Sequence, residues 1–185
     1  MLFSYQVFRR MRISFALFAL VLSVLADLAV AVSAEEINPP FGLQWGETPE
    51  HIEKLLKGAK AVVVDRHPIQ DREAWTVEGL IQADLRRTIF YFRSGQLSEV
   101  ELQYQSDEWD TNKYNDFMSQ VRQRIEKRYG AGQLVARSKT PDGDVMQTVV
   151  GYKWNQNNTS IQLIYFSAEN ANQIYRTVSV HYKSY

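Results

Sequence analysis

Residues 98–106 read SEVELQYQS, a run in which apolar and polar side chains alternate. Val100, Leu102 and Tyr104 would share one face of such a strand, and the glutamate and glutamine residues between them would share the other. This pattern is typical of an antiparallel sheet with one face buried and the other wet. Residues 176–184 read RTVSVHYKS and resemble the first run position by position.

The order of elements around these two runs suggests two similar halves. Each run closes a series of one helix and four strands, so the chain reads helix, four strands, helix, four strands. In one interpretation, 41–106 and 110–185 are half-repeats of a duplicated unit. In the other, any half-buried antiparallel strand carries such alternation and no duplication is involved. Both interpretations predict an α+β fold, an antiparallel sheet of about eight strands with two helices on one face.

Capping residues set the expected limits of both helices. Thr48 supplies a hydroxyl N-cap before a proline, and Gly58 ends that helix. Asp110 or Thr111 caps the second helix, and Gly130 stops it. The remaining segments are predicted as an opening strand at 41–45 and as further strands at 61–64, 74–80, 88–92, 97–104, 133–136, 146–154, 160–166 and 175–182.

The N-terminal 34 residues have the order of a secretory signal peptide. Arg9, Arg10 and Arg12 form a basic patch, an apolar run covers Ile13–Leu25, and small residues precede Ala34. We expect cleavage near Ala34 and export to the periplasm or the extracellular space. Residues 35–185 then form a single exported domain.

The alternative for this segment is an uncleaved membrane anchor. Ile13–Val32 is nominally long enough to span a bilayer. Asp27 lies inside the run, however, and a charge there costs about 2.5–3.5 kcal/mol on insertion scales. A membrane contact is expected only through this segment, and only if it is retained.

Composition excludes several classes of function. The chain has no cysteine, which removes thiol catalysis, thiolate metal sites and disulfides. Without the first 34 residues, which hold three Arg and one Asp, it carries 18 basic and 20 acidic residues and a net charge of −2. Nucleic-acid binding usually needs a clustered basic surface, so no nucleic-acid partner is expected. The basic residues of the second helix are interpreted as a solvated face.

Two segments carry a resemblance to known proteins. Residues 41–52, FGLQWGETPEHI, resemble the opening of small uncharacterised secreted bacterial domains, in which an aromatic-Gly-x-x-Trp-Gly strand leads into a Ser/Thr-capped helix. Residues 90–97, FYFRSGQL, are similar to the aromatic hairpin arm of those domains. The resemblance implies fold and compartment and carries over no catalytic residue. The order strand, helix, four strands is also similar to TATA-binding-protein-like domains, a likeness of fold alone.

Histidine and carboxylate spacing gives one weak catalytic candidate. No two of the three histidines share a metal-ligand spacing. His67 with Asp65 or Asp71 is the best available general base and partner. All three are expected in or beside a polar loop, where a solvated role is the simpler interpretation. His181 is expected on the wet face of the last strand.

Two carboxylate clusters could hold Ca²⁺, which takes several oxygen ligands. The first contains Asp107 and Asp110, and the second contains Asp142 and Asp144. The first cluster lies where a helix N-terminus attracts acids, and the second has ordinary turn composition. These structural roles are the preferred interpretations.

Trp109 is the aromatic residue whose position is least expected, because it lies in a polar loop before the second helix. It is predicted to pack on that helix one turn in, as a hydrophobic staple. The alternative is an exposed contact for a partner or a sugar ring. Trp45, Trp75, Trp154 and Tyr91 are expected to fill the core.

No serine-hydrolase elbow, phosphate-binding loop or dinucleotide-binding turn occurs in the sequence, and a serine nucleophile assembled across the fold is left open. We therefore expect a non-enzymatic exported binding or interaction domain without a cofactor, whose partner is a protein or a cell-envelope component. The alternatives are a hydrolase with dispersed catalytic residues and a small-ligand or carbohydrate binder.

Overall fold

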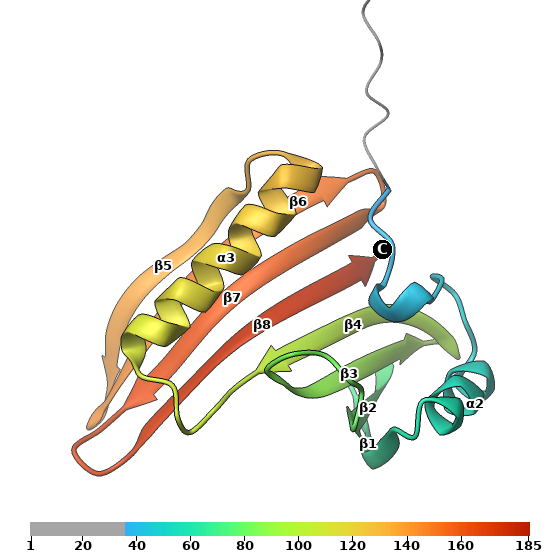
Figure 1. Cartoon of the computed structure of the whole chain (residues 1–185), viewed down its shortest axis with the longest axis horizontal. Helices are drawn as coiled ribbons and strands as arrows, with labels where there is room; N and C mark the ends of the chain where they lie inside the picture. The colour runs from blue at the N-terminus through green and yellow to red at the C-terminus, as the bar shows by residue number, and fades with distance from the viewer. Residues whose placement is uncertain (1–35) are drawn as a thin grey trace, which may run out of the picture. The chain divides into compact units, whose positions relative to one another are not determined.

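The structure, a computed structural model of the chain, describes residues 36–185. This part of the chain holds one antiparallel sheet of eight strands and two α-helices (Figure 1), which confirms the expected α+β fold. The elements in chain order are η1 (Pro40–Gly42), α2 (Pro49–Gly58), β1 (Val62–Ile69), β2 (Arg72–Glu78), β3 (Leu85–Arg93), β4 (Gln96–Tyr104), α3 (Thr111–Tyr129), β5 (Gln133–Asp142), β6 (Val145–Gln156), β7 (Thr159–Glu169) and β8 (Ile174–Ser184).

The predicted signal segment, residues 1–34, lies outside the described residues, so export stays a prediction. Within residues 36–185 no helix is both long enough and apolar enough to cross a membrane.

The sheet has the strand order β1-β2-β3-β4-β8-β7-β6-β5, so each half is a meander and the halves meet where β4 pairs with β8. In this pairing Leu102 lies opposite Val180, Val100 opposite Tyr182, and Tyr104 opposite Val178. The two runs that look alike in sequence are therefore direct neighbours, arranged symmetrically about Leu102 and Val180. A duplication would produce this symmetry, and it stays a prediction.

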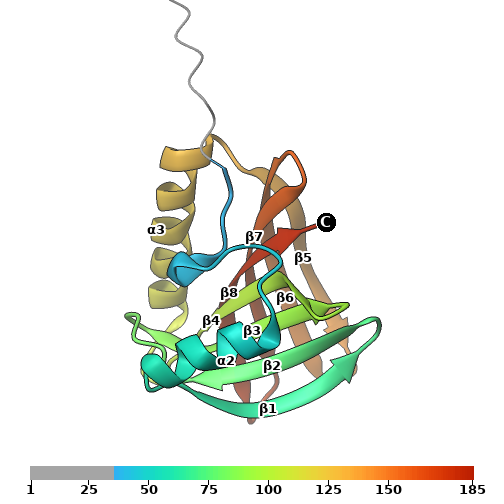
Figure 2. The same ribbon diagram turned by 90° about the vertical axis from the view of Figure 1, so that its right-hand side faces the viewer.

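One hydrophobic core fills the space between the helices and the sheet. Ile52 and Leu56 of α2 and a stripe of α3 belong to it, together with strand residues that include Trp75 and Trp154. Figure 2 shows both helices on the same, inner side of the curved sheet. The stripe of α3 agrees with its predicted periodicity, and its buried residues are Tyr114, Phe117, Met118, Val121 and Ile125.

The helix starts follow from the expected caps. The Thr48 hydroxyl accepts a hydrogen bond from the backbone N–H of His51, and Asp110 accepts one from the N–H of Lys113 at 2.8 Å. α3 ends at Gly130, which adopts φ 81°. Such a positive φ strains residues that carry a Cβ, so glycine suits this stop.

The expected opening strand at 41–45 is wrong. Pro40–Gly42 form a 3₁₀ turn, and Phe41 has φ 65° and ψ 19°. Pro40 has no backbone N–H to donate to a neighbouring strand, and the segment forms a turn instead. The segment is joined to β4 only through Gly46 and Glu47, whose backbone N–H and C=O bond Leu97 at 3.0 and 2.9 Å.

Two strands run further than expected. β1 continues through His67 and Pro68, which we expected in a polar loop, and β5 continues through Pro141 to Asp142, which we expected in a turn. Both are outermost strands of the sheet. A proline is tolerated there because the missing N–H can fall on the side without a partner strand.

Candidate functional site

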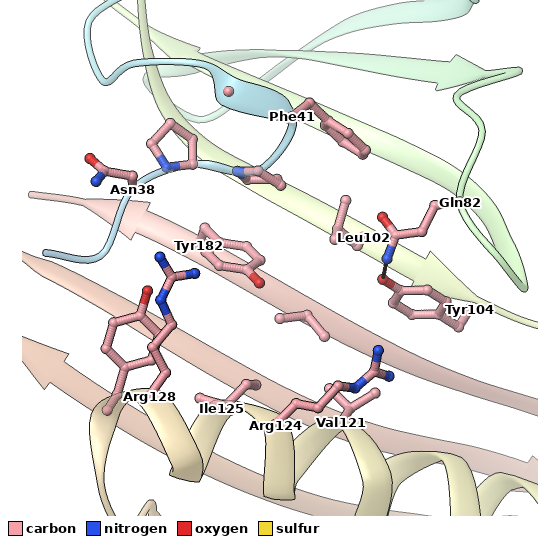
Figure 3. A pocket seen from close by; sticks show the side chains of 15 residues that line it. Asn38, Phe41, Gln82, Leu102, Tyr104, Val121, Arg124, Ile125, Arg128 and Tyr182 are labelled. Carbon is pink, nitrogen blue, oxygen red and sulfur yellow. Dashed lines mark hydrogen bonds between the residues drawn. The ribbon is translucent and has the colours of Figure 1, made fainter. Parts of the chain in front are cut away.

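Two adjoining cavities of about 450 and 660 Å³ form a groove along one flank of α3. They share Gln82, Tyr104 and Arg124, and we call them together the α3 groove. The first cavity lies between α3, the turn η1 and the central strands β4 and β8 (Figure 3). Its volume is in the usual range of small-molecule sites.

The floor of the first cavity is apolar. Leu102 and Val180 come from the paired strands at the centre of the sheet, and Val121 and Ile125 come from the core-facing stripe of α3. All four side chains are buried in the core. Side chains alternate between the two faces of the strands and recur on one side of α3, so these four apolar residues gather beneath the groove.

Three tyrosines, Tyr104, Tyr129 and Tyr182, line the first cavity above this floor. Burial raises the pKa of Tyr104 and of Tyr182, while the nearby positive charge of Arg124 acts to lower both. The burial effect is the larger, so both phenols stay protonated near neutral pH. The Tyr104 hydroxyl accepts a hydrogen bond of 2.6 Å from the Gln82 amide, drawn in Figure 3. Both hydroxyls retain a proton to donate.

The charge of the groove is strongly positive. Arg124 and Arg128 line the first cavity, and Lys113, Lys127 and Arg124 line the second. Asp84 is the one acidic residue among the described residues that line them. Arg124 makes no hydrogen bond or ion pair with any other residue in 36–185. Arg124, Lys127 and Arg128 are exposed, in agreement with a solvated face, and Arg124 also lines the space between the helix and the strands (Figure 3).

One exposed aromatic side chain, Phe41, lines the groove, and another exposed apolar residue, Ile81, is next in sequence to a lining residue. Phe41 is 42% exposed and lies across the first cavity from Arg124 (Figure 3). Its positive φ is rare for a bulky residue and costs roughly 1–3 kcal/mol. Ile81, next to Gln82 in the loop before β3, is 97% exposed. Strained backbone and exposed apolar groups of this kind concentrate at binding sites.

A second group of polar residues lies on the face of the sheet opposite the helices. Glu99 of β4 accepts hydrogen bonds from Arg72 at 2.6 Å and interacts with His181 Nδ1 at 2.9 Å and Lys183 at 3.2 Å. His181 Nε2 lies 3.0 Å from the Ser179 hydroxyl. We call these five residues the Glu99 cluster.

The Glu99 cluster corrects the expectation of a wet face. The Glu99 side chain is only 6% exposed and that of His181 only 15%. Neighbouring charged side chains cover the Glu99 carboxylate. Burial alone would raise the pKa of Glu99. The hydrogen bond from His181, the charges of Lys183 and His181, and the hydrogen bond from Arg72 outweigh burial and lower this pKa to about 2.

A neighbouring carboxylate on the same face is also satisfied. Glu101 accepts hydrogen bonds from the Tyr91 hydroxyl at 2.8 Å and from the Gln103 amide at 2.6 Å. Burial, followed by the charge of Glu101, raises the pKa of Tyr91, so this phenol remains a donor. The expected place of Tyr91 in the core is wrong, because it lies opposite Glu99 on the helix-free face.

Ser179 contacts His181, and His181 contacts Glu99, which is the arrangement of nucleophile, base and acid in a catalytic triad. A working triad also needs a cleft and donors for an oxyanion. None of the three residues lines the α3 groove. Ser179 is paired on both sides, with Gln103 and Ile164. Its backbone N–H therefore belongs to the sheet ladder.

The candidate catalytic residues expected from sequence form a separate, exposed group. His67 Nδ1 lies 2.7 Å from Asp65, and the two side chains are 48% and 56% exposed. Asp71 pairs with Arg93 at 3.0 Å. The three candidates do not line the α3 groove.

Two of the four candidate metal ligands, Asp110 and Asp142, make structural hydrogen bonds. Asp110 caps α3, and Asp107 lies in the loop before it. Asp142 accepts a hydrogen bond from Gln147 at 2.9 Å, and Asp144 lies in the turn between β5 and β6. No group of three or more His, Asp or Glu side chains in the described part of the chain is arranged to hold a metal ion.

Trp109 packs as the expected staple. Its ring lies 5.1 Å from Tyr114 and 4.9 Å from Phe117, between centroids, and the side chain is half-buried. Trp109 precedes the cap Asp110, and Tyr114 lies one turn into α3, which is the staple geometry. The alternative, a contact for a partner or a sugar ring, stays a prediction.

Comparisons of the chain with protein-family models, with curated proteins and with solved structures find no match. The resemblance to small secreted bacterial domains therefore stays a prediction.

Proposed function

We propose that this chain is an exported, non-enzymatic binding domain whose α3 groove holds an anionic amphiphile, a small molecule with an acidic head group and an apolar body. The observation that supports this best is Arg124, a cation without a partner among the described residues, placed over an apolar floor. A guanidinium in such a place is suited to a carboxylate, a sulfate or a phosphate.

The donors around Arg124 fit the head group. The hydroxyls of Tyr104 and Tyr182 can each donate a hydrogen bond to an acidic oxygen. Arg128 adds positive charge at the same cavity, and Lys113 and Lys127 continue it along α3. The excess of cations over the one acid, Asp84, favours an anion and disfavours a cation.

The apolar floor and rim fit the body of the ligand. Leu102 and Val180 are buried beneath the cavity, and an apolar chain lying on them would leave water. Phe41, which lines the first cavity and is partly exposed, extends this apolar surface. The sequence of residues 1–34 supports an exported protein, so the ligand is expected outside the cytosol.

The test is calorimetric titration of the purified exported protein with decanoate and with neutral decanol, both below their aggregation limits. We expect decanoate to bind more tightly than decanol. Arg124→Gln should raise the Kd of decanoate at least tenfold, since a hydrogen bond to a charged group contributes roughly 1.5–3 kcal/mol. The Kd of decanol should not change.

Lys54→Gln is the matched control, because it removes one exposed charge from α2 and leaves the groove intact. It should bind decanoate like the unmodified protein. Equal binding of decanoate and decanol, or equal loss in both variants, would contradict the proposal.

Hydrolysis is a second candidate function, favoured by the hydrogen-bonded order of Ser179, His181 and Glu99. It ranks lower because the Ser179 backbone belongs to the sheet ladder and none of the three residues lines the α3 groove. A fluorophosphonate probe, which labels reactive serines, separates the candidates. The binding proposal predicts no labelling, whereas labelling that Ser179→Ala abolishes would favour the hydrolase.

A further inference from the structure

A third cavity, of about 540 Å³, lies on the opposite flank of α3, between this helix and strands β5, β6 and β7. We call it the β5 cavity. It shares no lining residue with the α3 groove. We propose that the β5 cavity is a separate site for an anionic carbohydrate, a sugar that carries a carboxylate or a phosphate.

Sheet register explains how two cations of the outer strand reach this cavity. Arg137 lies opposite Val150, and Lys139 lies opposite Thr148. In the next pairing Val150 lies opposite Tyr165, a core residue on the helix side of the sheet. Directly opposed residues share a face, so Arg137 and Lys139 project from the helix side, toward the cavity.

The third cation is held in place by an aromatic ring. Arg122 of α3 donates a hydrogen bond of 2.9 Å to the Tyr152 hydroxyl, and its guanidinium lies 4.9 Å from the centre of that ring. Its Nε also lies 3.6 Å from Glu126. Arg122 is therefore oriented before any ligand arrives, which lowers the cost of binding.

The charge of the β5 cavity is not cancelled by its own acid. Glu169 is the one carboxylate among the described residues that line it, and Glu169 pairs with Arg176 at 3.0 Å. Arg137 and Lys139 make no hydrogen bond or ion pair with other residues of 36–185. Two positive charges are thus available to an acidic group.

Neutral polar groups distinguish this cavity from the α3 groove. Asn115 and Ser119 of α3 and Thr148 and Ser167 of the strands supply an amide and three hydroxyls to its lining. Groups that both donate and accept suit the hydroxyls of a sugar. The Tyr152 ring, which carries Arg122 over one face, also lines the cavity. Cations together with these groups indicate an acidic sugar in preference to an apolar acid.

The test is calorimetric titration of the purified exported protein with glucose 6-phosphate, glucuronate, glucose and inorganic phosphate. We expect the two acidic sugars to bind and to exceed glucose and phosphate by at least tenfold in affinity. The double variant Arg137→Gln, Lys139→Gln should raise the Kd of the acidic sugars at least tenfold. The double variant Arg137→Lys, Lys139→Arg keeps both charges and should retain most of the affinity.

Two controls separate this site from other effects. Lys153→Gln removes a charge from the helix-free face of neighbouring β6 and should leave sugar binding unchanged. Arg124→Gln, in the α3 groove, should also leave it unchanged. Absence of acidic-sugar binding, binding of phosphate as tight as that of glucose 6-phosphate, or loss of sugar binding in Arg124→Gln would overturn the proposal.

Discussion

Replacement of Glu99 by glutamine tests the charge cluster that joins the two halves of the sheet. Glu99 lies on β4, its partners His181 and Lys183 lie on β8, and Arg72 lies on β2. Glu99→Gln preserves the shape of the side chain and removes its charge. Arg72 and Lys183 then remain close together without a carboxylate between them, which is costly for partly buried cations.

The pKa of Glu99 sets the expected magnitude. Its interactions lower the pKa from 4.5 to about 2 in the folded protein. This difference corresponds to about 3 kcal/mol of folding free energy at neutral pH. In a domain of this length 1 kcal/mol moves the Tm by roughly 2–4 °C. We therefore expect the Tm of Glu99→Gln to be roughly 6–12 °C lower at pH 7.

The pH dependence has a definite sign. Because the pKa of Glu99 is lower in the folded than in the unfolded protein, its stabilisation is complete well above pH 4.5 and is lost as the pH falls through 4.5 toward 2. Urea unfolding at pH 7 and pH 3 measures this directly. At pH 3 roughly three fifths of the difference between the unmodified protein and Glu99→Gln should be gone.

Glu53→Gln is the matched control, because Glu53 pairs with Arg66 at 3.1 Å in an exposed ion pair. Such pairs contribute at most about 1 kcal/mol. The reasoning is refuted if Glu99→Gln is no less stable than Glu53→Gln at pH 7, or if its deficit is the same at pH 3.

Two further substitutions test the packing. Trp109→Ala removes the half-buried ring that packs on Tyr114, so it should lower the free energy of unfolding by about 2 kcal/mol. Urea titration measures this loss, and an unchanged unfolding midpoint would contradict the staple. At Gly132 an added Cβ would meet the Trp154 ring at 2.4 Å, so Gly132→Ala should cost about 1–3 kcal/mol and alter tryptophan fluorescence. Gly58→Ala, where a Cβ meets nothing within 4 Å, should be neutral or stabilising, and an equal loss at both glycines would contradict the packing argument.

The helices could be predicted from sequence because their signals are local. Thr48 and Asp110 carry the capping hydrogen bonds, and Gly130 stops α3 where expected. The lengths of β1 and β5 could not be predicted in this way. Pro68 and Pro141 normally interrupt strands, and they are accommodated only because both strands lie at the edges of the sheet.

The candidate sites depend on contacts that no local pattern contains. Glu99 and His181 are 82 positions apart and meet only because β4 pairs with β8. The likeness of 98–106 to 176–184 was a usable signal for that pairing, although it did not indicate buried charges. Arg124 lies on a flank of α3, and periodicity identifies only the core-facing stripe. Gln82, which lines the same cavities, comes from the loop before β3 and hydrogen-bonds Tyr104, 22 positions away in the sequence.

The central claim is that the α3 groove binds an acidic amphiphile through Arg124. The most direct measurement is an NMR titration with decanoate that follows the Arg124 side-chain N–H and the rings of Tyr104 and Tyr182. The account predicts shift changes that saturate together at these three residues, with Ser179 and His181 on the opposite face unaffected. Saturable changes that avoid Arg124 and the two tyrosines, or no saturable change at all, would contradict it.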